Sequence, residues 1–148
     1  MENVVGAVAQ RTRESLGAAR SARAAVARPR ILLVEDDFTL RAYLAELLIQ
    51  EGYDVVCAAD GAEAIARLQR ETSAPAAILL DIMLPRMGGV SFREVQLRSA
   101  DLRDVPTVAM TGTSNAKELS KLQFNAVLRK PIDLDRLVDM LAKFCPQS

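Results

Sequence analysis

The chain has 148 residues, of which half are hydrophobic and about a quarter are charged, a composition typical of one globular domain with its own core. It contains no His, which excludes the commonest general base and the commonest zinc ligand. The formal net charge is zero and no apolar run approaches the roughly 20 residues of a membrane span, so neither nucleic acid nor a membrane is an expected partner.

Residues 1–29 are rich in Ala and Arg, and the first 30 residues hold six Arg against Glu2 and Glu14. This composition permits a helix, but no apolar stripe would force such a helix to pack. Two interpretations stay open: a flexible or loosely helical tail, or a helix used for oligomerisation or anchoring. We expect this extension to precede one domain over residues 30–148.

Two features of the sequence indicate the cellular compartment of the protein. The N-terminus lacks the apolar core of a signal peptide, and Cys57 and Cys145 have neither CxxC nor metal spacing. We therefore expect a cytoplasmic protein in which both thiols stay reduced.

The first half of the domain alternates apolar runs with amphipathic stretches. Gly52 is expected to stop the first helix, and Asp60 with Glu63 three residues on has a capping-box pattern at the start of the second. In chain order the expected elements are a strand Ile31–Val34, a helix carrying Leu40, Leu44 and Leu48, a strand Val55–Ala58, a helix carrying Ala64, Ile65 and Leu68, and a strand Ala76–Leu80.

The second half continues the alternation, with Asp133 as the expected cap of the last helix. Its elements are a helix carrying Val90, Phe92, Val95 and Leu97, a strand Val105–Met110, a weak helix around Ala116–Leu122, a strand Ala126–Leu128, and a helix carrying Leu134, Leu137, Val138 and Leu141. Strands that are almost wholly apolar and separated by helices indicate a parallel sheet covered on both faces. With right-handed crossovers, the prediction is a doubly wound α/β domain with five strands.

Four of the five expected strands end in a reactive polar residue. Glu35 and Asp36 follow the first strand, Asp81 follows the third, Thr111 the fourth and Lys130 the last. In an open parallel sheet, ligands bind outside the carboxyl ends of the strands, near the topological switch point. One such residue alone would be a solvated loop charge, but four strand ends with this character indicate a single site.

The residue types in this expected site fit one chemistry. Three carboxylates in one pocket repel one another, and a hard cation that prefers oxygen ligands, such as Mg²⁺, would relieve the repulsion. A carboxylate can act as a nucleophile toward phosphorus, and phosphoryl transfer depends mainly on positioning and charge neutralisation. Lys130 would supply a positive charge and Thr111 a hydroxyl donor to the phosphoryl oxygens.

Four separated blocks of the sequence carry a resemblance to a known family. They are Ile-Leu-Leu-Val-Glu-Asp-Asp (31–37), Leu-Leu-Asp-Ile-Met-Leu-Pro-Arg-Met-Gly-Gly (79–89), Val-Pro-Thr-Val-Ala-Met-Thr-Gly (105–112) and Arg-Lys-Pro-Ile (129–132). Together they resemble the receiver domain of bacterial response regulators in two-component signalling, over about residues 29–145. The resemblance implies a flavodoxin-like fold with helices on both faces of a sheet of strand order 2-1-3-4-5.

The resemblance also implies a role for each acidic residue of the expected site. Asp81 would be the phosphoacceptor. Glu35 and Asp36 would hold Mg²⁺ together with Asp81 and the backbone carbonyl of Met83. Asp37, which follows the acidic pair, receives no ligand role.

The remaining implied features concern the phosphoryl group and the partners. Thr111 would be the switch hydroxyl, Lys130 the phosphate-binding lysine, and the Lys130–Pro131 bond would be cis. The implied phosphodonor is a sensor histidine kinase or a phosphotransfer protein, and the downstream protein is unknown. The domain is not expected to be an enzyme beyond self-phosphorylation and self-dephosphorylation.

Three features depart from the family pattern. Val127 stands where family members usually carry Tyr or Phe. The stretch from Thr111 to Lys130 is about one helical turn short and lacks the usual Gly-Ala-Asp before the last strand. No effector domain follows the final helix, which implies a single-domain protein. The first two departures leave open whether the usual output switch operates.

Two other functions stay open. A receiver-like interaction module whose output is independent of phosphorylation is favoured by the altered switch region and opposed by the intact set of site residues. A phosphatase of the dehalogenase-like class would also use an Asp nucleophile. That class is characterised by an Asp-x-Asp motif on its first strand. Here Met83 stands in place of the second acid after Asp81.

Overall fold

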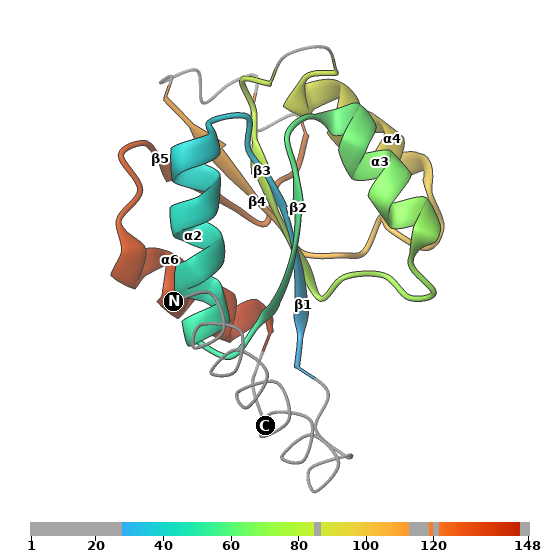
Figure 1. The fold of residues 1–148 in the computed structure, drawn as a ribbon. Coiled ribbons are helices and arrows are strands. Elements are labelled where there is room, and N and C mark those ends of the chain that lie inside the picture. The colour runs from blue at the N-terminus through green and yellow to red at the C-terminus, as the bar shows by residue number, and fades with distance from the viewer. Residues whose placement is uncertain (1–27, 85–86, 113–118, 120–121, 146–148) are drawn as a thin grey trace, which may run out of the picture.

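A computed structural model describes residues 28–84, 87–112, 119 and 122–145 of the chain (Figure 1). The expected alternation of strands and helices is confirmed there, whereas nearly all of the extension 1–29 and most of the weak helix around Ala116–Leu122 lie outside the described residues. The strands are β1 (Arg30–Val34), β2 (Asp54–Ala58), β3 (Ala77–Asp81), β4 (Thr107–Thr111) and β5 (Ala126–Arg129). The helices are α2 (Phe38–Gln50), α3 (Gly61–Arg70), α4 (Gly89–Arg98) and α6 (Leu134–Phe144).

The five strands form one parallel sheet in the order β2-β1-β3-β4-β5, as predicted. The order reverses between β1 and β3, so the topological switch point lies between these two neighbouring strands. β3 and β4 are buried along their whole length, as their almost wholly apolar sequences require.

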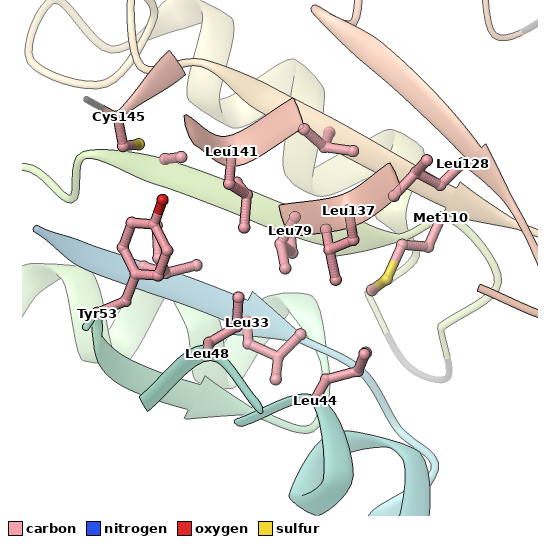
Figure 2. Close-up of a cluster of buried hydrophobic side chains, with 13 residues drawn as sticks. Leu33, Leu44, Leu48, Tyr53, Leu79, Met110, Leu128, Leu137, Leu141 and Cys145 are labelled. Atoms are coloured by element: carbon pink, nitrogen blue, oxygen red, sulfur yellow. The ribbon is translucent and has the colours of Figure 1, made fainter. Parts of the chain in front are cut away.

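Helices α2 and α6 cover one face of the sheet, and α3 and α4 cover the other (Figure 1). Because side chains alternate along a strand, each strand supplies both faces. On the first face, leucines of α2 and α6 pack on the sheet together with Tyr53 and Cys145 (Figure 2). On the second face, Phe92 of α4 and Ala64 of α3 pack on Leu32, Ile78 and Leu80.

Aspartates begin three of the helices. Asp37 accepts a hydrogen bond from Leu40 N at 3.1 Å, Asp60 from Glu63 N at 2.8 Å, and Asp133 from Arg136 N at 3.2 Å. Asp60 and Asp133 are therefore N-caps as predicted, and the return bond of Glu63 is accepted from the Ala59 N–H at 3.1 Å, one residue before the cap. None of the described helices is long and apolar enough to cross a membrane.

Every strand differs from its predicted bounds by one or two residues at one or both ends, most of all β3 and β4. β3 begins at Ala77 and β4 at Thr107, and each includes the polar residue that the sequence pattern placed after it. Pro106 has no N–H to give to the ladder, so β4 begins only after it. Asp81 and Thr111 are thus the last residues of their strands, held by the sheet itself.

Candidate phosphoacceptor and metal site

The carboxyl ends of β1, β3, β4 and β5 bring the predicted site residues to one edge of the sheet. Glu35 and Asp36 follow β1, and Asp81 ends β3, which pairs with β1. Thr111 is buried at the end of β4, and its carbonyl accepts a hydrogen bond from the backbone N–H of Lys130 at 2.8 Å. The Lys130–Pro131 bond is cis, as the resemblance implied.

Lys130 bridges two of the acids. Its Nζ donates to Glu35 Oε1 at 2.7 Å and to Asp81 Oδ2 at 3.0 Å. The other oxygen of Asp81, Oδ1, accepts from the backbone N–H of Met83 at 2.9 Å. The carboxylate of Asp81 is therefore held at both oxygens, which fixes its orientation at the end of β3.

The three acids are close enough to share a cation. One carboxylate oxygen each from Glu35, Asp36 and Asp81 lie within 4.8 Å of one another. Glu35 and Asp81 are buried, whereas Asp36 is exposed, so one side of the cluster is open to solvent. When Glu35 is ionised, its buried Oε2 has no hydrogen-bond donor among the described residues. A buried oxygen without a partner is costly, and Mg²⁺ would satisfy it with the ligand type that it prefers.

The pKa values of the two buried acids, Glu35 and Asp81, are shifted in opposite directions. Burial, together with the hydrogen bond and charge of Asp81, raises the pKa of Glu35 to about 8 despite the opposing effect of Lys130. For Asp81, burial acts to raise the pKa, but the hydrogen bonds from Glu35, Lys130 and the Met83 N–H outweigh it and lower the pKa. Asp81 is therefore the buried acid that stays ionised, the form in which a carboxylate is a nucleophile.

The charge of Lys130 is secured by the same contacts. Burial disfavours the ammonium form, but the hydrogen bonds and charges of Glu35 and Asp81 outweigh burial and raise the pKa of Lys130. A fixed positive charge thus lies in direct contact with the ionised carboxylate of Asp81.

Two residues outside the predicted set support the site: Arg41, which the sequence analysis missed, and Gly89, which the sequence placed in the loop after the acceptor. Arg41 of α2 reaches back to the turn after β1, where its Nη1 donates to the Glu35 carbonyl at 2.8 Å. Gly89, the first residue of α4, lies so close to the backbone of Asp81 that an added Cβ would be 2.5 Å from the Asp81 carbonyl oxygen. The Gly-Gly pair in the loop after Asp81 was the available signal for the second, and the sequence offered no local signal for the first.

A second buried polar cluster lies outside the site. Arg93, which is 3% exposed, donates to Gln96 Oε1 at 2.8 Å, Thr107 Oγ1 at 3.1 Å and the carbonyls of Leu122 and Gln123 at 3.1 and 2.9 Å. Thr107 begins β4, so this cluster is at the opposite end of that strand from Thr111.

Residues 31–142 match a family described as the response regulator receiver domain. Sporulation initiation phosphotransferase F of Bacillus subtilis is 28% identical over 118 residues, which are 79% of this chain and 94% of that protein. The CAI-1 autoinducer sensor kinase/phosphatase CqsS of Vibrio cholerae is 32% identical over 117 residues, and the transcription factor SKN7 of Chaetomium thermophilum is 33% identical over 119. The chain spans only 17% and 15% of the length of these last two relatives.

A solved structure of similar fold is the receiver domain of a sensor histidine kinase from Pseudomonas aeruginosa, which has a magnesium ion coordinated in its active site cleft. It is 30% identical to this chain with a TM-score of 0.72, and the match covers 80% of this chain and 98% of that one.

Proposed function

The chain belongs to the response regulator receiver domain family, and we propose that it accepts a phosphoryl group on Asp81 in a Mg²⁺-dependent reaction and signals through protein contacts or phosphorelay. One arrangement supports this above all. The ionised carboxylate of Asp81 is in hydrogen-bond contact with Lys130, and two further acids lie beside it. The proposed domain is residues 30–148, preceded by the extension 1–29, and the proposed site uses residues of the domain alone.

Glu35, Asp36 and Asp81 would hold Mg²⁺, with the backbone carbonyl of Met83 as a further ligand. The unpartnered Oε2 of Glu35 and the raised pKa of that residue support this set, because a cation would take the place of the retained proton. When bound, Mg²⁺ would neutralise charge on the acids and on the incoming phosphoryl group. The Pseudomonas aeruginosa relative, with magnesium in its cleft, is a precedent for such a site.

Asp81, Lys130 and Thr111 would each have a separate role in the phosphoryl transfer. A carboxylate oxygen of Asp81 forms the new bond to phosphorus, while the bond between phosphorus and the donor breaks and its electron pair leaves with the donor. No proton has to leave Asp81, because its carboxylate is already ionised. Lys130 would then neutralise the phosphoryl oxygens, and the Thr111 hydroxyl would donate a hydrogen bond to one of them.

The proposed phosphodonor is a sensor histidine kinase or a phosphotransfer protein. Two exposed apolar side chains lie beside the site residues and suit contact with a protein: Phe38 is 73% exposed and Met83 is 65% exposed. We place the reaction in the cytoplasm, because both cysteines are free thiols, as expected in a reducing compartment. Beyond self-phosphorylation and self-dephosphorylation, the domain has no proposed enzymatic activity.

The test is incorporation of phosphate from a small phosphodonor such as acetyl phosphate with Mg²⁺, measured by intact mass. The natural protein should gain one phosphoryl group, and Asp81→Asn should gain none. Asp36→Asn keeps the acceptor but loses one proposed ligand, so its labelling should recover as the Mg²⁺ concentration is raised. Undiminished labelling of Asp81→Asn would overturn the assignment, and steady turnover of a phosphomonoester would favour the phosphatase alternative.

Val127 keeps a second candidate open, that of a receiver-like module whose output does not depend on phosphorylation. This residue lies on β5, is 37% exposed, and pairs in register with Ala109 of β4. A β-branched side chain is stiff at χ1 and has no hydroxyl to exchange between core and solvent. If the phosphorylated protein and Asp81→Asn bind the downstream protein equally tightly, this candidate is favoured.

A further inference from the structure

The turn between β1 and α2 carries three acids in succession, and only part of its backbone is held by the sheet. The Glu35 N–H donates to the Ala58 carbonyl of β2 at 3.0 Å, and the Asp37 carbonyl accepts from the Arg41 N–H as the first bond of α2. The carbonyls of Glu35 and Asp36 lie between these two anchors. Their positions determine where the two carboxylates point.

The side chain of Arg41 binds both of these carbonyls. Its Nη1 donates to Glu35 O at 2.8 Å and, more weakly, to Asp36 O at 3.4 Å. Lys130, in contrast, binds the carboxylate oxygen of Glu35 directly. Arg41 therefore anchors the backbone of the acidic pair through main-chain oxygens, without occupying carboxylate oxygens that a cation would need.

The guanidinium also lies over an aromatic ring. The ring centroid of Phe38 lies 5.5 Å from Arg41 Cζ, one helical turn earlier on α2. Stacking on an aromatic ring restricts the planar guanidinium to one orientation, which a lysine ammonium would not adopt in the same way. The half-buried Arg41 thus contacts both the ring and the turn, and both contacts limit its orientation.

We propose that Arg41 is a positioning residue for the cation site: by holding the carbonyls of Glu35 and Asp36, it directs their carboxylates toward the metal. This inference rests on the proposed function, since it assumes that the acids bind Mg²⁺. Residues that orient metal ligands from outside typically contribute 10–100-fold to metal affinity. Loss of the Arg41 side chain should therefore weaken Mg²⁺ binding by about tenfold or more.

The direction of the change in Mg²⁺ affinity on replacement of Arg41 distinguishes a positioning role from an effect of its charge alone. A guanidinium close to a cation site repels the cation, so its removal without any positional effect would strengthen Mg²⁺ binding. Positioning predicts the opposite. Arg41→Met should therefore bind Mg²⁺ more weakly than the natural protein, and Arg41→Lys, which keeps the charge but loses the planar fork, should lie between them.

The experiment measures Mg²⁺ affinity by isothermal titration calorimetry in the absence of any phosphodonor, on the full chain and its variants. Arg67→Met is the matched control, because the exposed Arg67 of α3 pairs with Glu63 at 3.6 Å and makes no hydrogen bond to the described residues of the turn after β1. Its Mg²⁺ affinity should stay within about twofold of the natural value. Urea unfolding without metal reports whether each variant is folded. If Arg41→Met does not fold, the comparison of Arg41→Lys with the natural protein still decides the test.

Labelling with acetyl phosphate supplies a second measurement. For Arg41→Lys, the Mg²⁺ concentration at half-maximal rate should rise while the maximal rate at saturating Mg²⁺ stays close to natural. Unchanged or tighter Mg²⁺ binding by both Arg41 variants would overturn the positioning role and leave the proposed function standing. If the natural protein itself neither binds Mg²⁺ nor is labelled, the proposed function fails instead.

Discussion

Replacement of Gly89 should damage the acceptor loop, because no space exists there for a side chain. A Cβ at this position would lie 2.5 Å from the Asp81 carbonyl oxygen and 2.7 Å from Ile82 Cα, whereas ordinary contacts begin at 3.4 Å. Both neighbours are backbone atoms at the end of β3, so they cannot rotate away. Either α4 or the acceptor strand must move by about 0.9 Å at this contact.

The expected costs follow from this displacement. Overpacking of this kind typically costs about 1–3 kcal/mol, which corresponds to a fall of roughly 2–10 °C in melting temperature for a domain of this size. The Gly89 N–H also donates to the Ile82 carbonyl at 3.2 Å, so the shift reaches the residue next to the acceptor. A misplacement near 1 Å at a reacting group can cost about 100-fold in rate, and we expect Gly89→Ser to be labelled at least about tenfold more slowly.

Gly88 offers a control with the same substitution at the adjacent residue. An added Cβ there meets nothing within 4 Å, and its φ of −68° and ψ of 164° suit any residue. Gly88 is the N-cap of α4 without a side-chain cap, and Ser is preferred over Gly there by a few tenths of a kcal/mol. Urea unfolding and acetyl phosphate labelling of both Ser variants are the assays. Equal stability and equal labelling rates for the two would refute the close contact at Gly89.

Three further predictions concern pH, the second buried cluster and the extension. In the metal-free protein the pKa of Glu35 is about 8, above its ordinary value of 4.5, so the native state keeps a proton that the unfolded chain loses. The free energy of unfolding should therefore fall as pH rises between about 5 and 8, and Glu35→Gln should remove most of this fall in urea titrations at several pH values. Arg93→Met should lower the free energy of unfolding by about 3 kcal/mol, because it removes the donor to the buried Gln96 and Thr107 and to the part-buried carbonyls of Leu122 and Gln123; a loss below about 1 kcal/mol would contradict this role. Deletion of residues 1–28 should leave the labelling rate within about twofold of the natural rate, whereas a tenfold loss would place the extension at the acceptor edge.

The sequence was sufficient for the fold and for the arrangement of the site because both depend on local patterns. Apolar runs in the order β1 to β5, each followed by an amphipathic stretch, specify the parallel sheet, and the polar residue at each strand end then has one edge to occupy. The caps at Asp60 and Asp133 are equally local, since each is bonded to the residue three positions on.

Arg93 shows what such patterns do not contain. From the sequence alone, an arginine in α4 is expected to be exposed to solvent. The structure instead bonds it to the carbonyls of Leu122 and Gln123, which lie 29 and 30 residues away in the sequence. Gln123 adopts a φ of 51°, in the left-handed region that favours glycine, just before β5, where the family's usual glycine is missing. The Arg93 bond to its carbonyl helps to hold this conformation. A contact over that distance becomes visible only once the chain is folded. The bonds of Arg41 are local in the sequence, but their acceptors are main-chain carbonyls, which no residue type marks.

The placement of Cys145 and Tyr53 in one buried cluster has a consequence for how this domain can be joined to others. Tyr53 directly precedes β2, and Cys145 directly follows α6, so α6 ends near the amino ends of the strands (Figure 2). β1 begins at that same edge with Arg30. Both points of attachment are thus remote from the edge that carries Asp81. A reporter protein or an affinity module fused before residue 28 or after residue 145 should leave the acceptor accessible.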